Sequence, residues 1–493
     1  MSIRSQPGWS LARRLSLMQD TMRSLAPTAL AFVLALLISG ALAHSAYQLP
    51  VQHSDNLDAM VTASGASSTA SLFVSSLNAS STTLRPVRFV QTRWLMAFAD
   101  WQRLPYSVVF GGVHAGLAIA LMLAFTISLR LSGWTDLAAF GVAVLVLVGH
   151  HGFAAVFNQA YPINHFAQVA LCVSTALALA VGQPRRYNGA VVLVMLVYTL
   201  LLIEYGVLVW VVVAGAVLCG LPGLSRRVAI AATAVLAAYF LMRAVLGVSM
   251  PGIGNHGSGF GMEFYDASDL AERFGAHPVG FLAYTAVGSV LSILFSEPRL
   301  GLYKSLALFV NGSANPVFFI HVTASLLTTG TLLWHLAKRV PRHPADWSHR
   351  DRVFVVCGLL ILANGAVASA YMKDEMLAIG AMAYATAVFI AVRAAIDRVP
   401  SMRVATAVML AVALGLGGTL WGFRTVGVHY RLRLAAANTS GEWVISFPPG
   451  EPDRWPTDPR ARALTLQLRT EAIERRVIAR EFLPRWAERY WLE

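Results

Sequence analysis

Charged residues are scarce in this sequence, and acidic residues most of all. Asp, Glu, Lys and Arg make up 13% of the 493 residues, with 25 acids against 38 Lys and Arg, whereas hydrophobic residues make up 56%. Soluble domains carry about 25% charged residues, so the composition excludes an ordinary soluble enzyme. The apolar residues instead form repeated runs of the length that a helix needs to cross a bilayer. The sequence therefore predicts an all-α polytopic membrane protein.

Cysteine and nucleotide-binding loops are also lacking. Cys172, Cys219 and Cys357 lie far apart inside apolar runs, so we expect small buried side chains rather than a disulfide framework or a metal site. The sequence has no GxxxxGK[ST] loop and no GxGxxG motif after a strand. This absence argues against an ATP-driven machine.

The apolar runs predict about 11 transmembrane helices, in the range 10–12, since each span needs about 20 residues. Segment 278–296 is an exception. If it crossed the bilayer fully, the basic stretch 338–352 would face outward, so we expect residues 278–315 to be re-entrant or to lie along the outer interface. The apolar segments are 27–47, 105–129, 136–156, 164–182, 189–203, 206–223, 228–248, 278–296, 316–337, 353–371, 377–396 and 404–424.

Basic residues indicate the orientation. Arginines precede the first apolar run and recur after every second run, at Arg130, Arg185 with Arg186, and Arg226 with Arg227. Because cytoplasmic loops are enriched in Lys and Arg, we expect a cytoplasmic N-terminus and external loops at 48–104 and 249–315. In a bacterial inner membrane the external side is the periplasm. This distribution accounts for the formal charge of +13, and no nucleic-acid partner is expected.

Three parts are expected along the chain. Residues 1–26 would form a cytoplasmic interfacial helix, because SLARRLSLMQDTMRSL (10–25) is amphipathic. Residues 27–424 would form the transmembrane domain. Residues 425–493 contain the turn-rich linker SFPPGEPDRWPTDPR and then a helical pattern of mixed charge, so we expect a small helical cap on the periplasmic side.

The few acids gather on the expected external side. The stretch QHSDNLDAM (52–60) puts Asp55 and Asp58 on one face of a helix, at i and i+3, where one of two neighbouring carboxylates becomes a better proton acceptor. A pair of solvated loop acids is the alternative. Glu204 is the only charge in LVYTLLLIEYGVLVWVVV, and a charge at membrane depth marks a functional candidate. Asp55, Asp58 and Glu204 are therefore the candidate catalytic residues.

External cations are candidates for binding a phosphate. Arg85 lies in a basic and aromatic stretch, and Arg243 lies near the outer end of an apolar run. Arginine binds phosphate bidentately, although an interfacial helix or a snorkelling side chain would also explain these two residues. Arg299 and Lys304 are further candidates on the same side.

Three histidines are candidates for contacting the acceptor. His114 lies within an apolar helix, where a buried structural role is the alternative. His150 and His151 end an apolar run at the external side. Their spacing does not match a zinc motif, so no metal ligand is assigned and no cofactor is firmly predicted, with a divalent cation left open.

In this order the motifs resemble those of the GT-C superfamily of membrane glycosyltransferases, especially bacterial relatives of the protein O-mannosyltransferases and tetratricopeptide-bearing mannosyltransferases. That family carries an Asp–Asp or Asp–Glu element in its first external loop, which SDNLDAM resembles with Asp55 as the closest equivalent. Arg85-Pro86-Val87 is similar to its RPL/RPV element, and Ile203-Glu204 to its KE turn, with Ile in place of Lys. The two acids are separated here rather than adjacent, and the second external loop lacks an acid.

The resemblance implies a GT-C-like fold and transfer of a sugar from a polyprenyl phosphate or diphosphate on the periplasmic face. Asp55 would act on the acceptor hydroxyl, and external arginines would hold the departing phosphate. The partners would be the lipid-linked donor, the bilayer, and a glycan, lipid or protein acceptor. The alternatives are a transporter or flippase of lipid-linked or small polar substrates, a lipid-linked polymerase or ligase, and a non-catalytic membrane subunit.

Overall fold

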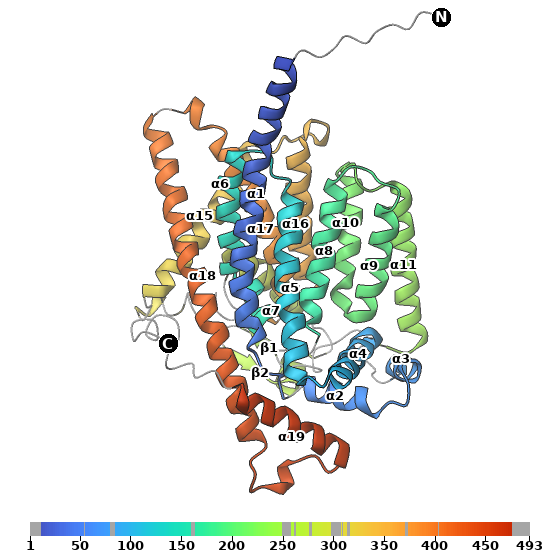
Figure 1. Cartoon of the computed structure of the whole chain (residues 1–493). Coiled ribbons are helices and arrows are strands. Elements are labelled where there is room, and N and C mark those ends of the chain that lie inside the picture. The colour runs from blue at the N-terminus through green and yellow to red at the C-terminus, as the bar shows by residue number, and fades with distance from the viewer. Residues whose placement is uncertain are drawn as a thin grey trace, which may run out of the picture.

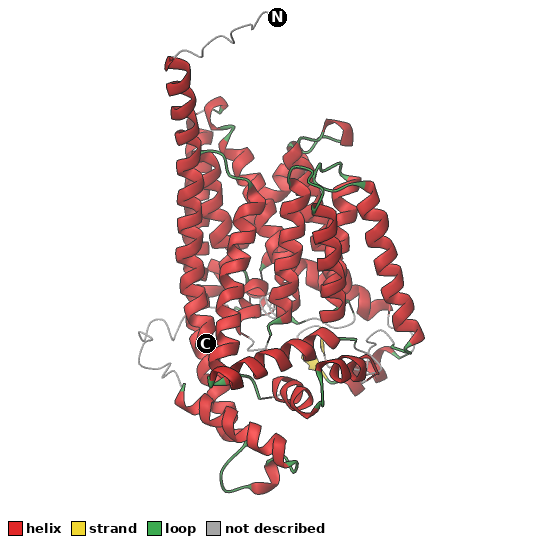
Figure 2. Cartoon of the chain, turned by 45° about the vertical axis from the view of Figure 1, so that its right-hand side comes forward, coloured by secondary structure: helices red, strands yellow, loops and turns green. Residues whose placement is uncertain are grey.

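The protein is nearly all helical in the computed structural model (Figures 1 and 2). The described residues also include one two-stranded antiparallel ribbon, formed by β1 (Ser258–Phe260) and β2 (Glu263–Tyr265). The expected all-α class is therefore confirmed. The structure describes residues 11–53, 55–78, 84–158, 163–248, 258–260, 263–275, 279–296, 307, 309–312, 316–369, 373–402 and 404–475.

Six helices are long and apolar enough to cross a membrane, and bent helix pairs raise the number to as many as eight within the described residues. The chain is thus a multi-pass membrane protein, while the total of about 11 spans stays a prediction. The six helices are α1 (Leu11–Tyr47), α5 (Tyr106–Leu129), α11 (Arg226–Val245), α15 (Pro316–Lys338), α17 (Ala378–Ile396) and α18 (Val404–Ser446).

The remaining apolar helices are broken, short or charged at one end. α6 (Trp134–Gly149) and α7 (His151–Asn158) meet at 52°. Three consecutive helices, α8 (His165–Val181), α9 (Asn188–Leu202) and α10 (Val207–Leu218), are apolar but shorter, with 17, 15 and 12 residues. α16 (His349–Val367) begins with the charged turn His349-Arg350-Asp351-Arg352. Because of these breaks, short lengths and charged ends, these helices are not among the six long apolar ones.

The segment expected to be re-entrant begins as a sharply bent helix pair. α12 (Ala267–Phe274) and α13 (Val279–Phe295) meet at 117°, as in a broken span or a re-entrant loop. One face of α13, including Phe281 and Ile293, is buried in the bundle. Most of residues 297–315 lie outside the described part of the chain.

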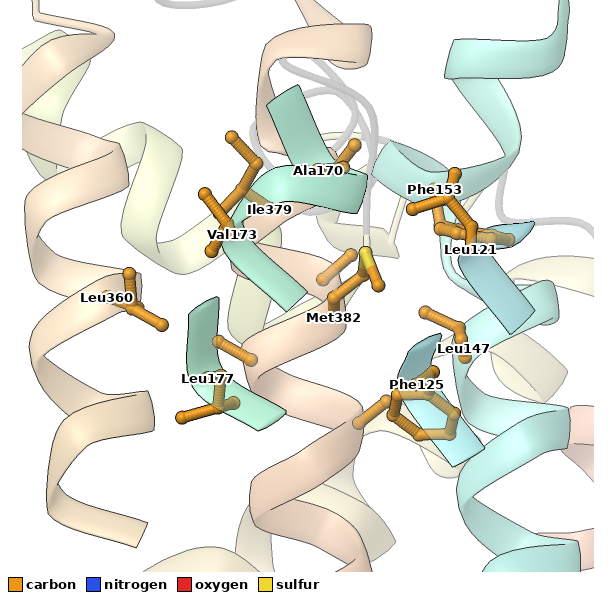
Figure 3. Close-up of a cluster of buried hydrophobic side chains, with 14 of the residues drawn as sticks. Leu121, Phe125, Leu147, Phe153, Ala170, Val173, Leu177, Leu360, Ile379 and Met382 are labelled. Carbon is orange, nitrogen blue, oxygen red and sulfur yellow. The ribbon is translucent and has the colours of Figure 1, made fainter. Parts of the chain in front are cut away.

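α17 forms the centre of the bundle. Every residue from Ala378 to Val392 is buried, and α6, α7, α8, α15 and α16 pack around this helix. Many of its side chains are alanines, and such small residues let neighbouring helices approach closely. Figure 3 shows the resulting apolar contacts, in which residues of α5, α6, α7, α8 and α16 surround Ile379 and Met382 of α17.

Four amphipathic helices gather at one end of the bundle, which we call the cap end (lower in Figures 1 and 2). They are α2 (Asp55–Gly65), α3 (Thr69–Asn78), α4 (Pro86–Gln102) and α19 (Pro459–Glu474). α4 exposes aromatic side chains, with Trp94 at 60% and Trp101 at 76%. Exposed aromatics on a helix at the end of a membrane bundle suit the lipid headgroup plane.

Two helices run across expected domain boundaries. The expected interfacial helix at 10–25 is continuous with the first span, because α1 runs unbroken from Leu11 to Tyr47 and passes through Pro27. The expected end of the transmembrane domain at 424 falls inside α18, which continues to Ser446. The polar part of α18 stays helical because it packs on the cap end, where the buried Trp443 donates a hydrogen bond to the Val51 carbonyl at 2.6 Å.

Candidate functional site

Glu204 lies in a tight turn between α9 and α10. α9 ends at Leu202, Ile203 is extended, and Glu204 starts a short 3-10 turn, η1 (Glu204–Gly206). The turn packs so closely on α9 that a Cβ at Gly206 would lie 2.4 Å from the Thr199 carbonyl carbon. Glycine is therefore required here, and the close packing fixes the position of Glu204.

The structure brings Glu204 together with Arg85 and Arg243, which we call the arginine–glutamate cluster. Arg85 donates from Nη2 to Oε2 of Glu204 at 2.9 Å and from Nε to the same oxygen at 3.2 Å. Arg243 donates from Nη1 to the other oxygen, Oε1, at 3.3 Å, and also to the Tyr239 hydroxyl at 3.2 Å. Arg243 is only 3% exposed and Glu204 18%, so the cluster is sheltered from water.

Local sequence explains how Arg85 reaches this cluster. Pro86 occupies the first turn of α4, where its fixed φ favours helix initiation and its missing N–H costs nothing. Arg85 therefore stands just before the helix, and its side chain is directed to the η1 turn rather than along α4. Arg243 is in the last turn of α11, so three separate elements supply the cluster.

The two arginines keep Glu204 ionised. Burial by itself would raise the pKa of the Glu204 carboxyl, but the positive charges of Arg85 and then Arg243 outweigh it and hold that pKa below its usual range. A carboxylate with a lowered pKa is a weak base at neutral pH. The arrangement therefore favours Glu204 as a positioning residue for two guanidinium groups.

Further cations surround the cluster. His165, the first residue of α8, is 2% exposed and lies within electrostatic range of Arg85, Arg88 and Lys373. Its helix is capped by Asn164, whose side chain accepts from the Ala167 N–H at 3.2 Å. The cap end thus concentrates positive charge where α4, α8 and η1 meet, and such a concentration attracts anions.

A mostly apolar groove is lined in part by α4 and α9, the helices that lead to Arg85 and Glu204. Its volume is about 370 Å³, and α4, α5, α8 and α9 line it. Gln91, Gln168 and Tyr198 form its polar edge, where the Gln168 amide donates to Gln91 at 3.0 Å and the Tyr198 hydroxyl hydrogen-bonds to both glutamines. The other lining residues are Trp94, Leu95, Val113, Leu117, Leu171 and Cys172.

Helix geometry gives the spacing between groove and cluster. Gln91 follows Arg85 by six residues on α4, and Tyr198 precedes Glu204 by six residues along α9 and its turn. At about 1.5 Å per helical residue, the interval on α4 corresponds to about 9 Å along the helix axis. A ligand with an apolar tail in the groove can therefore present an anionic group to the arginines.

The structure does not connect the first external acids to this cluster. Asp55 begins α2, and its side chain lies outside the described part of the structure. Asp58 is exposed, and within the described residues no ion pair joins it to Arg85 or Arg243. The apolar face of α2 belongs to the same core as Met96 and Ala99, in the half of α4 farther from Arg85. Arg299 and Lys304 lie outside the described residues.

The predicted histidines lie in helices or at a helix break. His114 is 2% exposed within α5. His150 stands at the break between α6 and α7, where its Nδ1 accepts from the Gly152 N–H at 3.1 Å and its Nε2 lies 2.8 Å from the Ile293 carbonyl. Because Nδ1 accepts the first hydrogen bond, the proton is on Nε2, which donates to the Ile293 carbonyl. His150 therefore links the break between α6 and α7 to the end of α13. His151 lies 3.1 Å from Asp374, and the described residues contain no group of three or more metal ligands.

Sequence reasoning missed several polar residues. Gln91, Gln168 and Tyr198 are neutral and fall within or beside apolar stretches, where charge-based reasoning gives them no weight. Arg424 is 1% exposed, and it donates to the backbone of Ser296 at 2.5 Å and of His321 at 3.3 Å. The sequence did contain a signal for Arg424, because this residue is the first charge after a long apolar run.

As a chemical unit, the site combines guanidinium groups with a groove large enough for part of a lipid chain. Arg85 and Arg243 supply N–H donors that suit a phosphate, and the groove supplies the apolar surface that a lipid chain requires. Comparison of the chain with protein-family models, curated proteins and solved structures finds no match.

Proposed function

We propose that this chain is a GT-C-type glycosyltransferase that moves a sugar from a polyprenyl phosphate or diphosphate to an acceptor at the cap end. The observation that carries the proposal is that α4 and α9 both line the apolar groove and both lead to the arginine–glutamate cluster. A donor with an isoprenoid tail and an anionic head matches both halves of this arrangement. A small soluble substrate would not need the groove.

The proposed reaction follows from this placement. The acceptor hydroxyl oxygen forms a bond to the anomeric carbon of the sugar while the bond from that carbon to the phosphate oxygen breaks. The acceptor proton passes to a carboxylate, and the polyprenyl phosphate leaves with an added negative charge. Arg85 and Arg243 would stabilise that charge as it develops, and Glu204 would hold both arginines in place.

Asp55 remains the proposed proton acceptor. It starts α2 at the cap end, and Asp58 follows three residues later on the same helix. Helix geometry puts residues at i and i+3 on one face, which supports the expected pairing of the two acids. In the cell, the cap end would face the periplasm of a bacterial inner membrane and the N-terminus would be cytoplasmic.

The test uses membranes containing the full chain and labelled polyprenyl-phosphate sugars. Wild type should move label from the donor to an acceptor. Asp55→Asn should reduce the rate by about 100-fold or more, as expected for loss of a general base, and Arg85→Gln by about tenfold or more. Arg460→Gln, an exposed arginine on α19, is the matched control and should leave transfer unchanged.

Two outcomes would overturn the proposal. If wild-type membranes leave the donor intact but carry it across the bilayer, the protein is a flippase. If Asp55→Asn and wild type transfer label equally, Asp55 is not the base. A loss confined to Asp58→Asn would assign that role to Asp58 instead.

A further inference from the structure

A second pocket lies at the end of the bundle opposite the cap. α5 begins beside α19, where the Glu471 carboxylate accepts from the Ser107 N–H at 2.8 Å, and it runs away from the cap end to Leu129. Arg130 therefore lies at the opposite end. There the end of α5 meets the end of α8, the start of α16 and the last turns of α17 around a cavity of about 220 Å³. We call this cavity the Arg130 pocket.

The Arg130 pocket has a basic rim and an apolar floor. Arg130, His349 and Arg350 form the rim, and none of the residues that line the pocket is acidic. Leu129, Val353 and Phe389 are buried in the floor. A cavity of this size takes in part of a lipid rather than a whole one, so the rim would meet a head group and the floor the start of a chain.

Glycine at 182 allows Arg130 to lie over the end of α8. A Cβ at Gly182 would be 2.9 Å from Nη2 of Arg130, which is closer than real side chains approach. On the other side of the turn, Thr28 of α1 donates a hydrogen bond to the Leu131 carbonyl at 3.1 Å. The Thr28 hydrogen bond helps to fix the position of the turn that carries Arg130.

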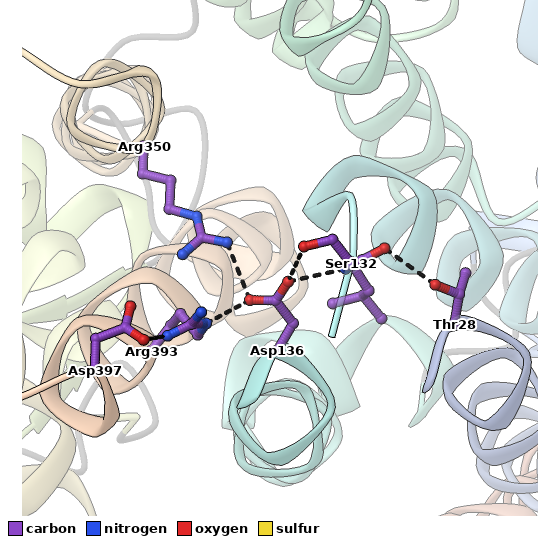
Figure 4. A network of polar contacts seen from close by, with 7 residues as sticks. Thr28, Ser132, Asp136, Arg350, Arg393 and Asp397 are labelled. Carbon is purple, nitrogen blue, oxygen red and sulfur yellow. Dashed lines mark hydrogen bonds and ion pairs between the residues drawn. The ribbon is translucent and has the colours of Figure 1, made fainter. Parts of the chain in front are cut away.

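Arg350 is positioned by a buried carboxylate (Figure 4). Asp136 is fully buried, and its Oδ1 accepts from Arg350 Nη2 at 3.0 Å and from Arg393 Nε at 2.6 Å. Its Oδ2 accepts from the backbone and hydroxyl of Ser132 at 2.9 and 2.8 Å. The Arg350 side chain is still 40% exposed, so it is anchored at one nitrogen while it faces the rim.

The positive charge of the rim comes from Arg130 and from Arg350, which is paired at one nitrogen with Asp136. Burial first, and then the charges of Arg130, Arg352 and Arg350, lower the pKa of His349 below its usual value. The start of α16 is already capped, because Ser348 and Asp351 form a capping box there, so the charge at the rim comes from the arginine side chains. The rim therefore favours an anion, and basic pockets between transmembrane helices are typical sites for phosphate head groups.

We propose that the Arg130 pocket binds the phosphate of an anionic amphiphile, with a phospholipid head group at the rim and the start of its chain on the apolar floor. The same rim chemistry would hold a free phosphate, so the test separates the two sources. This inference is independent of the proposed transferase activity.

The test measures ligand retention by the purified full chain, using native mass spectrometry and thermal unfolding. The probes are phosphatidylglycerol, phosphatidylcholine with identical acyl chains, and inorganic phosphate. Wild type should retain phosphatidylglycerol and unfold at a higher temperature in its presence, and phosphatidylcholine should have little effect. The double variant Arg130→Gln/His349→Gln should weaken phosphatidylglycerol binding by about tenfold or more, and Arg130→Lys with His349 intact should keep most of it.

The matched control is Arg186→Gln, an exposed arginine in the turn between α8 and α9. It should bind phosphatidylglycerol as wild type does, and all variants should have similar unfolding temperatures without lipid because the changed side chains are exposed. Equal retention by the double variant and wild type would overturn the site. Stabilisation by inorganic phosphate alone, lost in the double variant, would support the anion site and overturn its assignment to a lipid.

Discussion

At the scale of single residues, the arginine–glutamate cluster is the most constrained feature of the cap end. One carboxylate receives two guanidinium groups, and Arg243 is almost fully buried. A buried ion pair adds little net stability, but removal of one partner leaves an uncompensated charge. Substitution of Glu204 should therefore lower the stability of the protein more than substitution of Arg243.

We expect Glu204→Gln to destabilise the protein by about 2–4 kcal/mol, because it leaves Arg243 buried without its carboxylate. Arg243→Met should cost less, since Arg85 still pairs with Glu204. The double variant Glu204→Gln/Arg243→Met should recover part of the loss, because it removes the buried cation that had lost the Glu204 carboxylate. Thermal unfolding in one detergent measures all three variants. Additive losses in the double variant would show that the two side chains are not coupled.

At the scale of elements, α19 is held against the membrane bundle by Glu471 and Arg475, two residues at its end that we call the clamp. Glu471 accepts from the N–H groups of Tyr106 and Ser107, at 3.1 and 2.8 Å, which are free N–H groups of the first turn of α5. Arg475 donates to the Ser107 carbonyl at 2.8 Å. A carboxylate at a helix N-terminus also interacts favourably with the helix dipole, so the clamp stabilises α5 and α19 together.

Glu471→Ala should therefore lower the free energy of unfolding by about 1–2 kcal/mol. It should also release α19, so that limited proteolysis cuts the segment 447–458 faster. Glu474→Ala provides the comparison, because Glu474 is exposed one turn later on the same helix. Equal proteolysis of the two variants would mean that Glu471 does not hold α19 against the bundle.

At the scale of the whole molecule, the bundle has two chemically different ends. The cap end holds the amphipathic helices (Figure 1), and the groove and the arginine–glutamate cluster are formed by helix segments near this end. The opposite end holds the arginine-bearing turns and the Asp136 network (Figure 4). Because cytoplasmic loops are enriched in arginine, we expect the opposite end to face the cytoplasm.

Cysteine labelling tests this orientation in a chain whose three native cysteines are replaced by alanine. Ser67→Cys, exposed between α2 and α3, should react with a membrane-impermeant maleimide in intact spheroplasts. Arg186→Cys, exposed at the opposite end, should react only after lysis. The reverse pattern would invert the topology and exclude a periplasmic active site.

The sequence predicted the fold class and part of the site through local signals. Long apolar runs require helices in a bilayer, since every backbone polar group must be satisfied within the segment. Glu204 stood out as the single charge in its run, and Pro86 marked the start of α4 and so the place of Arg85. The prediction of a helical membrane protein is confirmed, because one segment of chain contains all the information that it needs.

The sequence by itself determined that this is a helical membrane protein with a few costly charges that need partners. Only the tertiary structure decided which partners they have: Arg85 meets Glu204 across 119 residues of sequence and Arg350 meets Asp136 across 214. It also decided that α18 continues past 424 and that Gln91, Gln168 and Tyr198 share one edge of a groove. The physical reason is that hydropathy and helix propensity act within a segment, whereas ion pairs and grooves depend on how segments pack.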